Sequence, residues 1–328
     1  MFDVITFGSA TKDIFLNTKE FLVKDSGVKS SELKILLPFG LKIDIKDVYF
    51  HSGGGGANTA TSFAMQGFKT AYCGTVSRDW AGEDILRELK EKKIETKFVF
   101  RTEKKPSNLS IIFSTPKERT ILAYKGASNE LEENLSWSDL KKTKWVYLAP
   151  LAGQWIPCFK KIVDWANKNK IKVFVNPGNS QLKMNRKTLK LILKKTDILF
   201  LNLEEARILV KDFEASEDEL ISKIKKFFSG ILIITNGKNK IFLAKDNNIF
   251  SVLPPRTKAV DKTGAGDAFG SGFLSGFMQS EDIEYSIGLA IANAISCLKK
   301  RGAKEGLLEK KEEQRSGKKI KIKKLNYA

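Results

Sequence analysis

The chain has 328 residues, of which 42% are hydrophobic and 29% are charged, a composition typical of globular proteins rather than fibrous or disordered ones. No apolar stretch reaches the roughly 18 to 20 residues that a membrane span needs, and the first ten residues lack the basic start of a signal peptide, so we expect a cytoplasmic protein without a membrane partner. The net charge of +19 comes mainly from lysines scattered along the expected helices, which favours a solvated surface over specific nucleic-acid binding.

Short apolar runs alternate with stretches of helical periodicity through most of the chain. The runs are typical of buried strands and lie at 4–8, 70–74, 145–149, 173–176, 198–202 and 231–235. The helical stretches lie at 58–67, 82–92, 157–168, 203–210 and 218–228. This alternation predicts an α/β fold with a mostly parallel sheet and helices on both faces, in which ligands bind at the carboxyl ends of the strands.

Other segments alternate apolar and polar residues and predict a second, half-exposed sheet. They lie at 13–18, 35–49, 108–114 and 120–124, with turn residues at 115–117. We expect them to be insertions in one domain that spans 1–328, and to form a lid from segments at approximately 12–20, 33–50 and 107–125.

Cysteine and histidine usage excludes several kinds of site. Cys73, Cys158 and Cys297 are far apart, so a disulfide framework or a CxxC metal site is not expected. His51 is the only histidine, and any catalytic triad or zinc site would have to use it. General-base chemistry is therefore expected from a carboxylate.

The sequence SGGGGAN at 52–58 precedes an expected helix. A bare glycine backbone lets a polyhydroxylated ligand approach the N–H groups, and Asn58 offers donors and an acceptor at the helix start. Asp13, five residues after the end of the first strand, could accept hydrogen bonds from ligand hydroxyls. The alternatives are a flexible loop with an asparagine cap and, for Asp13, an exposed lid residue.

The sequence NLEE at 202–205 lies where a strand ends and a helix begins. Asn202 and Glu205 are three residues apart and point the same way, so an amide and a carboxylate could order the waters of Mg²⁺ and phosphate oxygens. A helix cap with a capping-box glutamate is the structural alternative.

The strongest pattern is DKTGAGDAF at 261–269, followed by an apolar stretch rich in small residues at 270–278. Unpaired N–H groups at the start of such a helix, together with the helix dipole, can hold an anion. Asp267 could accept the proton of a hydroxyl that attacks phosphorus, or simply cap the helix. The chain has no GxxxxGK[ST] sequence and Phe269 replaces the third glycine of GxGxxG, which disfavours a Walker-type NTPase and a dinucleotide fingerprint.

The carboxy-terminal 25 residues are basic. Residues 320–325 alternate apolar and lysine side chains, which predicts an edge strand with its lysines outward.

Together, the segments 53–58, 202–205 and 261–269 resemble the glycine signature, the NxxE motif and the DTTGAGDxF signature of the ribokinase-like family of carbohydrate kinases, often called the PfkB family. The resemblance covers nearly the whole chain. It implies one α/β domain with a small β-sheet lid, ATP in a groove, and phosphoryl transfer to a hydroxymethyl group.

The resemblance also implies roles for individual residues. The catalytic residues would be Asp267 as the base and an anion hole formed by Gly264, Ala265 and Gly266. The acceptor would be held by Asp13, Gly54, Gly55 and Asn58. The nucleotide would be contacted by Asn202, Thr235, Gly237 and Asn293. Glu205 would hold Mg²⁺ through water, and Asp261 matches the position from which some members bind a monovalent cation such as K⁺.

The resulting hypothesis is an ATP-dependent kinase that acts with Mg²⁺ on a primary hydroxyl of a small sugar or sugar-like metabolite, and forms a homodimer through the lid. Gly55 replaces the lysine of the ribokinase signature, and NPG at 176–178 replaces an Asp-x-Asn sequence. Both positions bear on acceptor binding, so the sequence does not identify the acceptor molecule. One alternative is a nucleoside kinase on the same scaffold, marked by an aromatic pair from Phe39, Phe50 or Phe113. The other is a binding protein without turnover.

Overall fold

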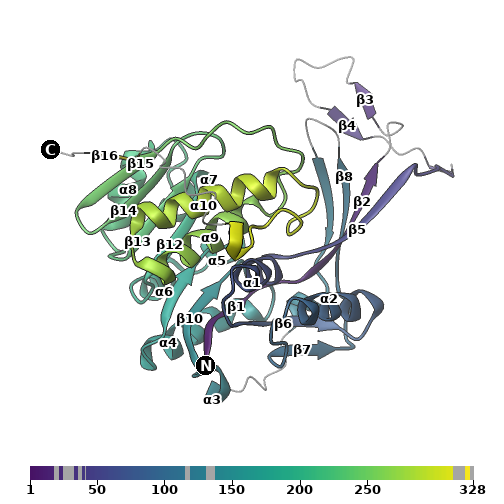
Figure 1. Cartoon of the computed structure of the whole chain (residues 1–328), viewed down its shortest axis with the longest axis horizontal. Helices are drawn as coiled ribbons and strands as arrows, with labels where there is room; N and C mark the ends of the chain where they lie inside the picture. Colours follow the sequence, from purple (N-terminus) through teal and green to yellow (C-terminus); the bar gives the residue numbers. More distant parts are fainter. Residues whose placement is uncertain are drawn as a thin grey trace.

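Two separate sheets carry most of the molecule, a ten-stranded sheet that forms the body and a four-stranded sheet that projects from it (Figure 1). The computed structural model describes residues 1–17, 22–24, 33–35, 39–40, 42–114, 119–130, 137–312 and 322–325. All the residues expected at the site lie within these ranges.

The large sheet is parallel over most of its width. Its strands are, in spatial order, β7 (Val99–Thr102), β6 (Thr70–Ser77), β1 (Phe2–Phe7), β10 (Thr143–Leu148), β11 (Lys172–Val175), β12 (Ile198–Asn202), β13 (Ile231–Thr235), β14 (Ile241–Lys245), β15 (Asn248–Val252) and β16 (Ile322–Leu325). The strands from β7 to β13 pair in parallel, and the last three pair antiparallel. All six expected body strands are present, and the expected edge strand is confirmed at Ile322–Leu325.

Helices cover both faces of the large sheet because its central strands are apolar on both sides. Val146 and Leu148 belong to the core on one face and Tyr147 to the core on the other. The first face is covered by α4 (Trp155–Lys168), α5 (Asn179–Leu182), α6 (Arg186–Leu193), α7 (Leu203–Val210) and α8 (Glu217–Lys225). The second is covered by α1 (Gly55–Met65), α9 (Ala265–Ser280) and α10 (Ile283–Leu298), with α2 (Trp80–Glu91) packed beside α1. The mostly parallel α/β fold is therefore confirmed.

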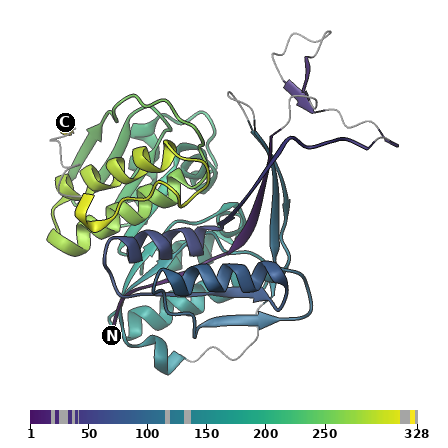
Figure 2. The same ribbon diagram turned by 45° about the vertical axis from the view of Figure 1, so that its right-hand side comes forward.

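The small sheet has the strand order β5 (Asp47–Gly53), β2 (Thr11–Asn17), β8 (Asn108–Ser114) and β9 (Arg119–Tyr124). It stands away from the body in both views, with the short pair β3 (Leu22–Lys24) and β4 (Leu33–Ile35) beyond it (Figure 2). The expectation of one alternating segment over 35–49 was wrong, because β4 ends at Ile35 and β5 begins only at Asp47. Residues 18–21, 25–32, 36–38, 41 and 115–118 of this region lie outside the described residues.

Two helices begin within the glycine sequences of the expected site. α1 starts at Gly55 rather than at Asn58, whereas α9 starts at Ala265, among the glycines where its first turn was expected. The expected ligand-binding loops are thus the first turns of helices, whose N–H groups point away from the helix body. No helix in the described part of the chain is long and apolar enough to cross a membrane.

Candidate active site

The first turns of α1 and α9 meet at the carboxyl ends of the body strands. Asn58 Nδ2 donates a hydrogen bond to Asp267 Oδ2 over 2.8 Å. A Cβ atom placed on Gly55 would lie 3.4 Å from Asp267 Oδ1 and 3.2 Å from Ala149 Cβ, just beyond the end of β10. The structure therefore brings the expected base into contact with two expected acceptor-binding residues.

Asp267 is partly buried in this junction. Burial raises the pKa of its carboxyl group, and the hydrogen bond from Asn58 opposes that rise. Asn58 itself is buried, and its Oδ1 atom has no hydrogen-bond partner among the described residues. The junction thus holds one carboxylate of increased basicity and one open amide acceptor.

The turn that precedes Asp267 leaves backbone N–H groups open. Gly264 has φ 76°, and a Cβ atom there would lie 2.5 Å from Ala303 Cβ, so only glycine fits this left-handed position. A Cβ atom on Gly266 would meet nothing within 4 Å, and no side chain caps the helix. The N–H groups of Gly264, Ala265 and Gly266 can therefore face an anion.

Asp13 lies on β2 at the base of the small sheet and is 5% exposed. A Cβ atom on Gly53 would lie 2.2 Å from Asp13 Oδ2, so the absence of a side chain at Gly53 makes room for the carboxylate. Burial raises the pKa of Asp13 to about 6, while a hydrogen bond from Ser110 and the charges of Lys304 and His51 oppose the rise. The expected alternative of an exposed Asp13 is thus wrong.

Asn202 and Glu205 form a reciprocal cap at the start of α7. The Glu205 N–H group donates to Asn202 Oδ1 over 2.8 Å, and the Asn202 N–H group donates to Glu205 Oε2 over 2.9 Å. Burial raises the pKa of Glu205 to about 7, against the hydrogen bond from Asn202, and the negative charges of Glu204 and Asp267 add to the rise. The helix cap that was the structural alternative is therefore present. The Glu205 carboxylate also lies close enough to Asp267 for the two negative charges to repel each other.

The remaining nucleotide residues follow the neighbouring strand. Thr235, at the end of β13, lies opposite Asn202 in the parallel register. Gly237 follows two residues later, with φ 53° and an exposed backbone. These residues share the sheet edge at which α7 and α9 begin.

Comparison with known proteins identifies the family of the chain. A model of the pfkB family of carbohydrate kinases matches residues 3–311, which is nearly the whole chain. The chain belongs to the pfkB family of carbohydrate kinases. A sugar kinase of Archaeoglobus fulgidus, described as uncharacterized, is 28% identical over 247 residues, which cover 74% of this chain and 96% of that protein.

Solved structures of the pfkB fold superpose over almost all of the chain. The nucleoside kinase of Methanocaldococcus jannaschii, described as an archaeal member of the ribokinase family, has a TM-score of 0.73 and 20% identity, with 96% of this chain and 97% of that chain covered. An E. coli protein assigned as a ribokinase II, solved with ATP and Mg²⁺, has a TM-score of 0.78 and 17% identity, with 96% and 99% covered. Kinases with this fold thus bind ATP and Mg²⁺.

Asn293 differs from the other pfkB positions because it lies inside the protein, with 0% exposure. Its Nδ2 atom donates to Ser62 Oγ over 3.0 Å and to the Ala268 carbonyl over 2.8 Å, and its Oδ1 atom accepts from the Leu308 N–H group over 2.9 Å. A nucleotide contact would require this side chain to give up bonds that join α1, α9 and α10. The structure thus shows Asn293 as a buried link between helices, without an exposed side-chain atom that could contact a nucleotide.

Asp261 is also tied to protein groups. Its Oδ1 atom accepts from the N–H group and the hydroxyl of Thr263, and its Oδ2 atom accepts from the Gly302 N–H group over 3.0 Å. Over the described ranges, no group of three or more histidine, cysteine, aspartate or glutamate side chains is arranged to hold a metal ion. Asp261 therefore joins the glycine turn to the loop after α10.

The aromatic residues named for a nucleoside site do not share a face with Asp13. Directly paired residues point to the same side of a sheet, and successive residues point to opposite sides. Asp13 lies opposite His51, so Phe50 points to the other face. Phe113, three residues after the Ser110 partner of Asp13, does so too, and Phe39 is fully exposed. Phe15 and Tyr49 are the aromatic residues on the Asp13 face of β2 and β5.

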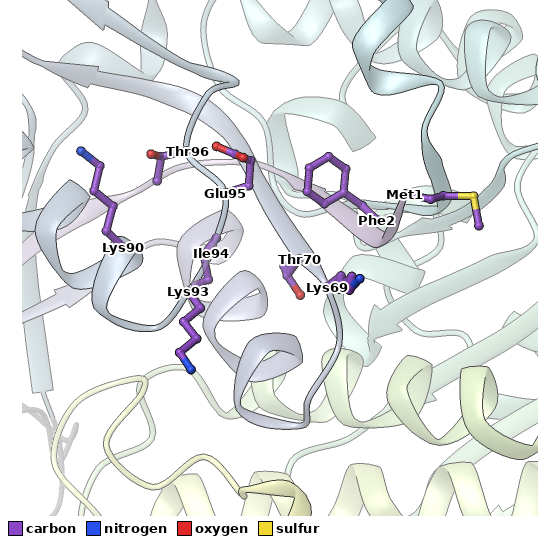
Figure 3. Close-up of a pocket in the computed structure, with 9 residues that line it drawn as sticks. All are labelled: Met1, Phe2, Lys69, Thr70, Lys90, Lys93, Ile94, Glu95 and Thr96. Atoms are coloured by element: carbon purple, nitrogen blue, oxygen red, sulfur yellow. The ribbon is translucent and has the colours of Figure 1, made fainter.

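A pocket of about 530 Å³ lies elsewhere, at the amino ends of β1 and β6 (Figure 3). It is lined by Met1, Phe2, Lys69, Thr70, Lys90, Lys93, Ile94, Glu95 and Thr96. None of the expected site residues reaches it, so it belongs to the opposite end of the sheet from the pfkB motifs.

Two residues that contribute to the electrostatics of the site had no pattern in the sequence. The Ser110 hydroxyl donates a hydrogen bond to the Asp13 carboxylate, and Lys304 lies buried in the loop after α10. Alternation in β8 could have placed Ser110 on the Asp13 face. Lys304 resembles the many solvated lysines of the chain, and only the tertiary structure distinguishes it.

Proposed function

We propose that the protein transfers the terminal phosphoryl group of ATP to a primary hydroxyl group of a sugar or sugar-like metabolite, with Asp267 as the general base. The observation that carries this proposal is the contact between Asn58 and Asp267 at the open first turn of α9. This contact supports the proposal because it joins an amide that could bind hydroxyls to a carboxylate that could act as a base, beside a turn whose N–H groups could bind an anion.

The acceptor would lie against the glycine backbone of Gly54 and Gly55. Asn58 Oδ1 would accept a hydrogen bond from one hydroxyl, and Asp13 would accept hydrogen bonds from others. Asp267 would accept the proton of the attacking hydroxyl, and its raised pKa strengthens it as a base while the carboxylate is ionised. Positioning by these groups supplies much of the catalysis in phosphoryl transfer.

The phosphates of ATP would lie against the N–H groups of residues 264–266, with Asn202, Thr235 and Gly237 along the nucleotide. Glu205 and Asp267 are two half-buried carboxylates, and no lysine or arginine pairs with either of them in the described part of the chain. A divalent cation would suit this excess negative charge, and Glu205 with Asn202 would hold Mg²⁺ through its waters. When bound, Mg²⁺ neutralises charge that develops on the phosphates.

A monovalent cation beside Asp261 would have to share this carboxylate with protein groups. Three protein donors already contact its carboxylate, and K⁺ would have to use its remaining lone pairs or nearby carbonyl groups. Assays in which K⁺ is replaced by tetramethylammonium test this point. Equal turnover in both buffers would remove K⁺ from the list of cofactors.

The direct test is an assay of ADP formation with Mg²⁺, ATP and a panel of pentoses, hexoses and nucleosides, followed by ³¹P NMR of the products. Turnover of a sugar to a primary phosphate ester is expected, because neither Phe50 nor Phe113 shares the Asp13 face. Turnover of a nucleoside alone would favour the nucleoside-kinase alternative. No turnover by a folded, ATP-binding protein would favour the non-catalytic alternative.

Two properties of the whole protein complete the proposal. A homodimer would form through the face of the small sheet opposite Asp13, which exposes Phe50, Leu122 and Val48 to 56%, 52% and 42%. The protein would act in the cytoplasm, where ATP is available and where its three described free thiols stay reduced.

A further inference from the structure

Lys304 is one of two buried lysines among the described residues, at 7% exposure, and both lie at the base of the small sheet. Lys304 Nζ lies 2.5 Å from Glu88 Oε1 on α2, and the Ser52 hydroxyl donates to the other oxygen of Glu88. The second buried lysine, Lys12, pairs with Asp84 one helical turn earlier. A buried ammonium group is costly unless it is paired, so its position here needs an explanation.

The loop residues 302–305 contact both halves of the candidate site. The Gly302 N–H group donates to Asp261, and Ala303 packs against Gly264 at the start of α9. Glu305 accepts a hydrogen bond from His51 on β5 over 3.4 Å, next to Asp13 in the register. Lys304 therefore sits between the anion-binding turn and the acceptor side of the site.

Charged and polar groups of several elements surround Asp13. Lys304 and His51 attract its negative charge, and Asp261 repels it. The hydroxyl of Ser110 donates to it from β8. Glu88 pairs with Lys304 and offsets part of its positive charge. In a poorly hydrated setting, a single ammonium group changes the ionisation of a nearby carboxyl substantially.

We propose that Lys304 is a positioning residue for the acceptor: through Glu88 and Ser52 it fixes the strand that borders Asp13, at the base of the small sheet, against the body. Its ammonium group also favours the ionised form of Asp13, which accepts hydrogen bonds from hydroxyls. This inference rests on the proposed function only in giving Asp13 its role in acceptor binding; the electrostatic link between the two side chains is independent of it.

The first test measures Asp13 without any substrate. Protein labelled with ¹³C at the aspartate carboxyl carbons is titrated by NMR, and D13N assigns the resonance. The midpoint of Asp13 is expected near pH 6 in the unmodified protein and at least about one pH unit higher in Lys304→Met. Lys12→Met is the matched control, because it removes an equally buried lysine that pairs with Asp84 on the opposite face of the small sheet from Asp13. The midpoint of Asp13 should shift clearly less in this variant than in Lys304→Met.

An unchanged midpoint in folded Lys304→Met, or equal rises in both variants, would overturn the proposal. If Lys304→Met does not fold, Glu88→Gln replaces it. That variant frees the ammonium group from its carboxylate partner, so the Asp13 midpoint should fall, and a constant or higher midpoint would contradict the link.

The second test uses whichever sugar of the panel is phosphorylated. At pH 6.5, Lys304→Met should lower kcat/KM for the sugar by about three- to tenfold, and the defect should disappear near pH 9, where Asp13 is ionised in both proteins. The KM for ATP should stay within about twofold. A defect that is the same at every pH would indicate a merely structural role. A shifted Asp13 midpoint in a protein that phosphorylates no sugar would leave the link intact and reject the proposed function.

Discussion

Asn58 and Asp267 are 209 positions apart in the chain and share a hydrogen bond. This contact distinguishes Asp267 from an ordinary helix-capping aspartate. A capping side chain accepts hydrogen bonds from N–H groups of its own helix, whereas this carboxylate accepts one from a side chain of another helix.

Asp267→Asn is expected to lower kcat by at least ~10²-fold with the fold and ATP affinity nearly intact, because the amide keeps the shape and loses the basicity. Steady-state kinetics and ATP titration measure this. Asp282→Asn is the control, since Asp282 caps α10 away from the site and should affect stability rather than turnover. Turnover near the unmodified rate would show that Asp267 is not the base.

Asp13→Asn is expected to change the pH dependence of stability. The pKa of Asp13 is raised to about 6 in the folded protein from an ordinary value of 3.8, so the folded state binds the proton more tightly. Stability therefore falls as the pH rises between these values, by up to about 2 to 3 kcal/mol for this group. The free energy of unfolding of Asp13→Asn should not show this decrease.

Urea unfolding of both proteins between pH 4 and pH 7.5 measures the effect. The free energy of unfolding of the variant, relative to the unmodified protein, should increase across this range. A constant difference would mean that Asp13 is not destabilised by burial.

Sequence motifs predicted Asp267 and Asn58 because the chemistry at these positions requires particular residue types. Lys304 could not be predicted, since 57 lysines and arginines occur in the chain and most of those in the described segments are exposed. Asn293 shows the converse: the family resemblance implied a nucleotide contact, whereas the hydrogen bonds of its side chain join α10 to α1, to α9 and to the loop at Leu308.

At the level of elements, the start of α9 contains two glycines with different requirements. Gly264→Ala should destabilise the protein by about 2 to 4 kcal/mol, because it combines a left-handed backbone with a collision against Ala303. Gly266→Ala should be neutral or stabilising by about 0.5 to 1 kcal/mol, since its methyl group meets no protein atom.

The two variants should also differ in activity. The methyl group of Gly266→Ala would project into the space proposed for the phosphates, so kcat/KM for ATP should fall at least about tenfold in a stable protein. Thermal unfolding and kinetics on both variants separate the effects. Full activity of Gly266→Ala would argue against phosphate binding at this turn.

The parallel strands were the most predictable elements, because strands buried on both faces are continuous apolar runs, and β12 and β13 have the expected bounds. β7 and the hairpin of β14 and β15 were missed; these short segments acquire strand structure from neighbours that lie beside them in space. α10 was also missed, because its isoleucine-rich sequence fits a buried strand as well as a helix.

For the whole molecule, the outer face of the small sheet gives a prediction about assembly. Phe50→Glu should convert the proposed dimer to a monomer, because a carboxylate at the centre of an apolar interface is costly to bury. Light scattering after size-exclusion chromatography measures the mass. Lys46→Glu, an exposed change of charge beyond the start of β5, is the control and should leave the mass unchanged. A monomeric unmodified protein would contradict the dimer directly.

The order of the small sheet has a consequence for how the protein is synthesised. β2 is translated near the beginning of the chain, yet in the sheet it lies between β5 and β8. Thr11 cannot pair until its parallel partner Asn108 has been synthesised. A nascent chain on the ribosome therefore exposes an unpaired strand edge until most of the first half of the body has emerged. Asp13 reaches its final surroundings later still, since Lys304 is among the last described residues to be translated. The proposed recognition of the acceptor by Asp13 is consequently a property that only the nearly complete polypeptide can acquire.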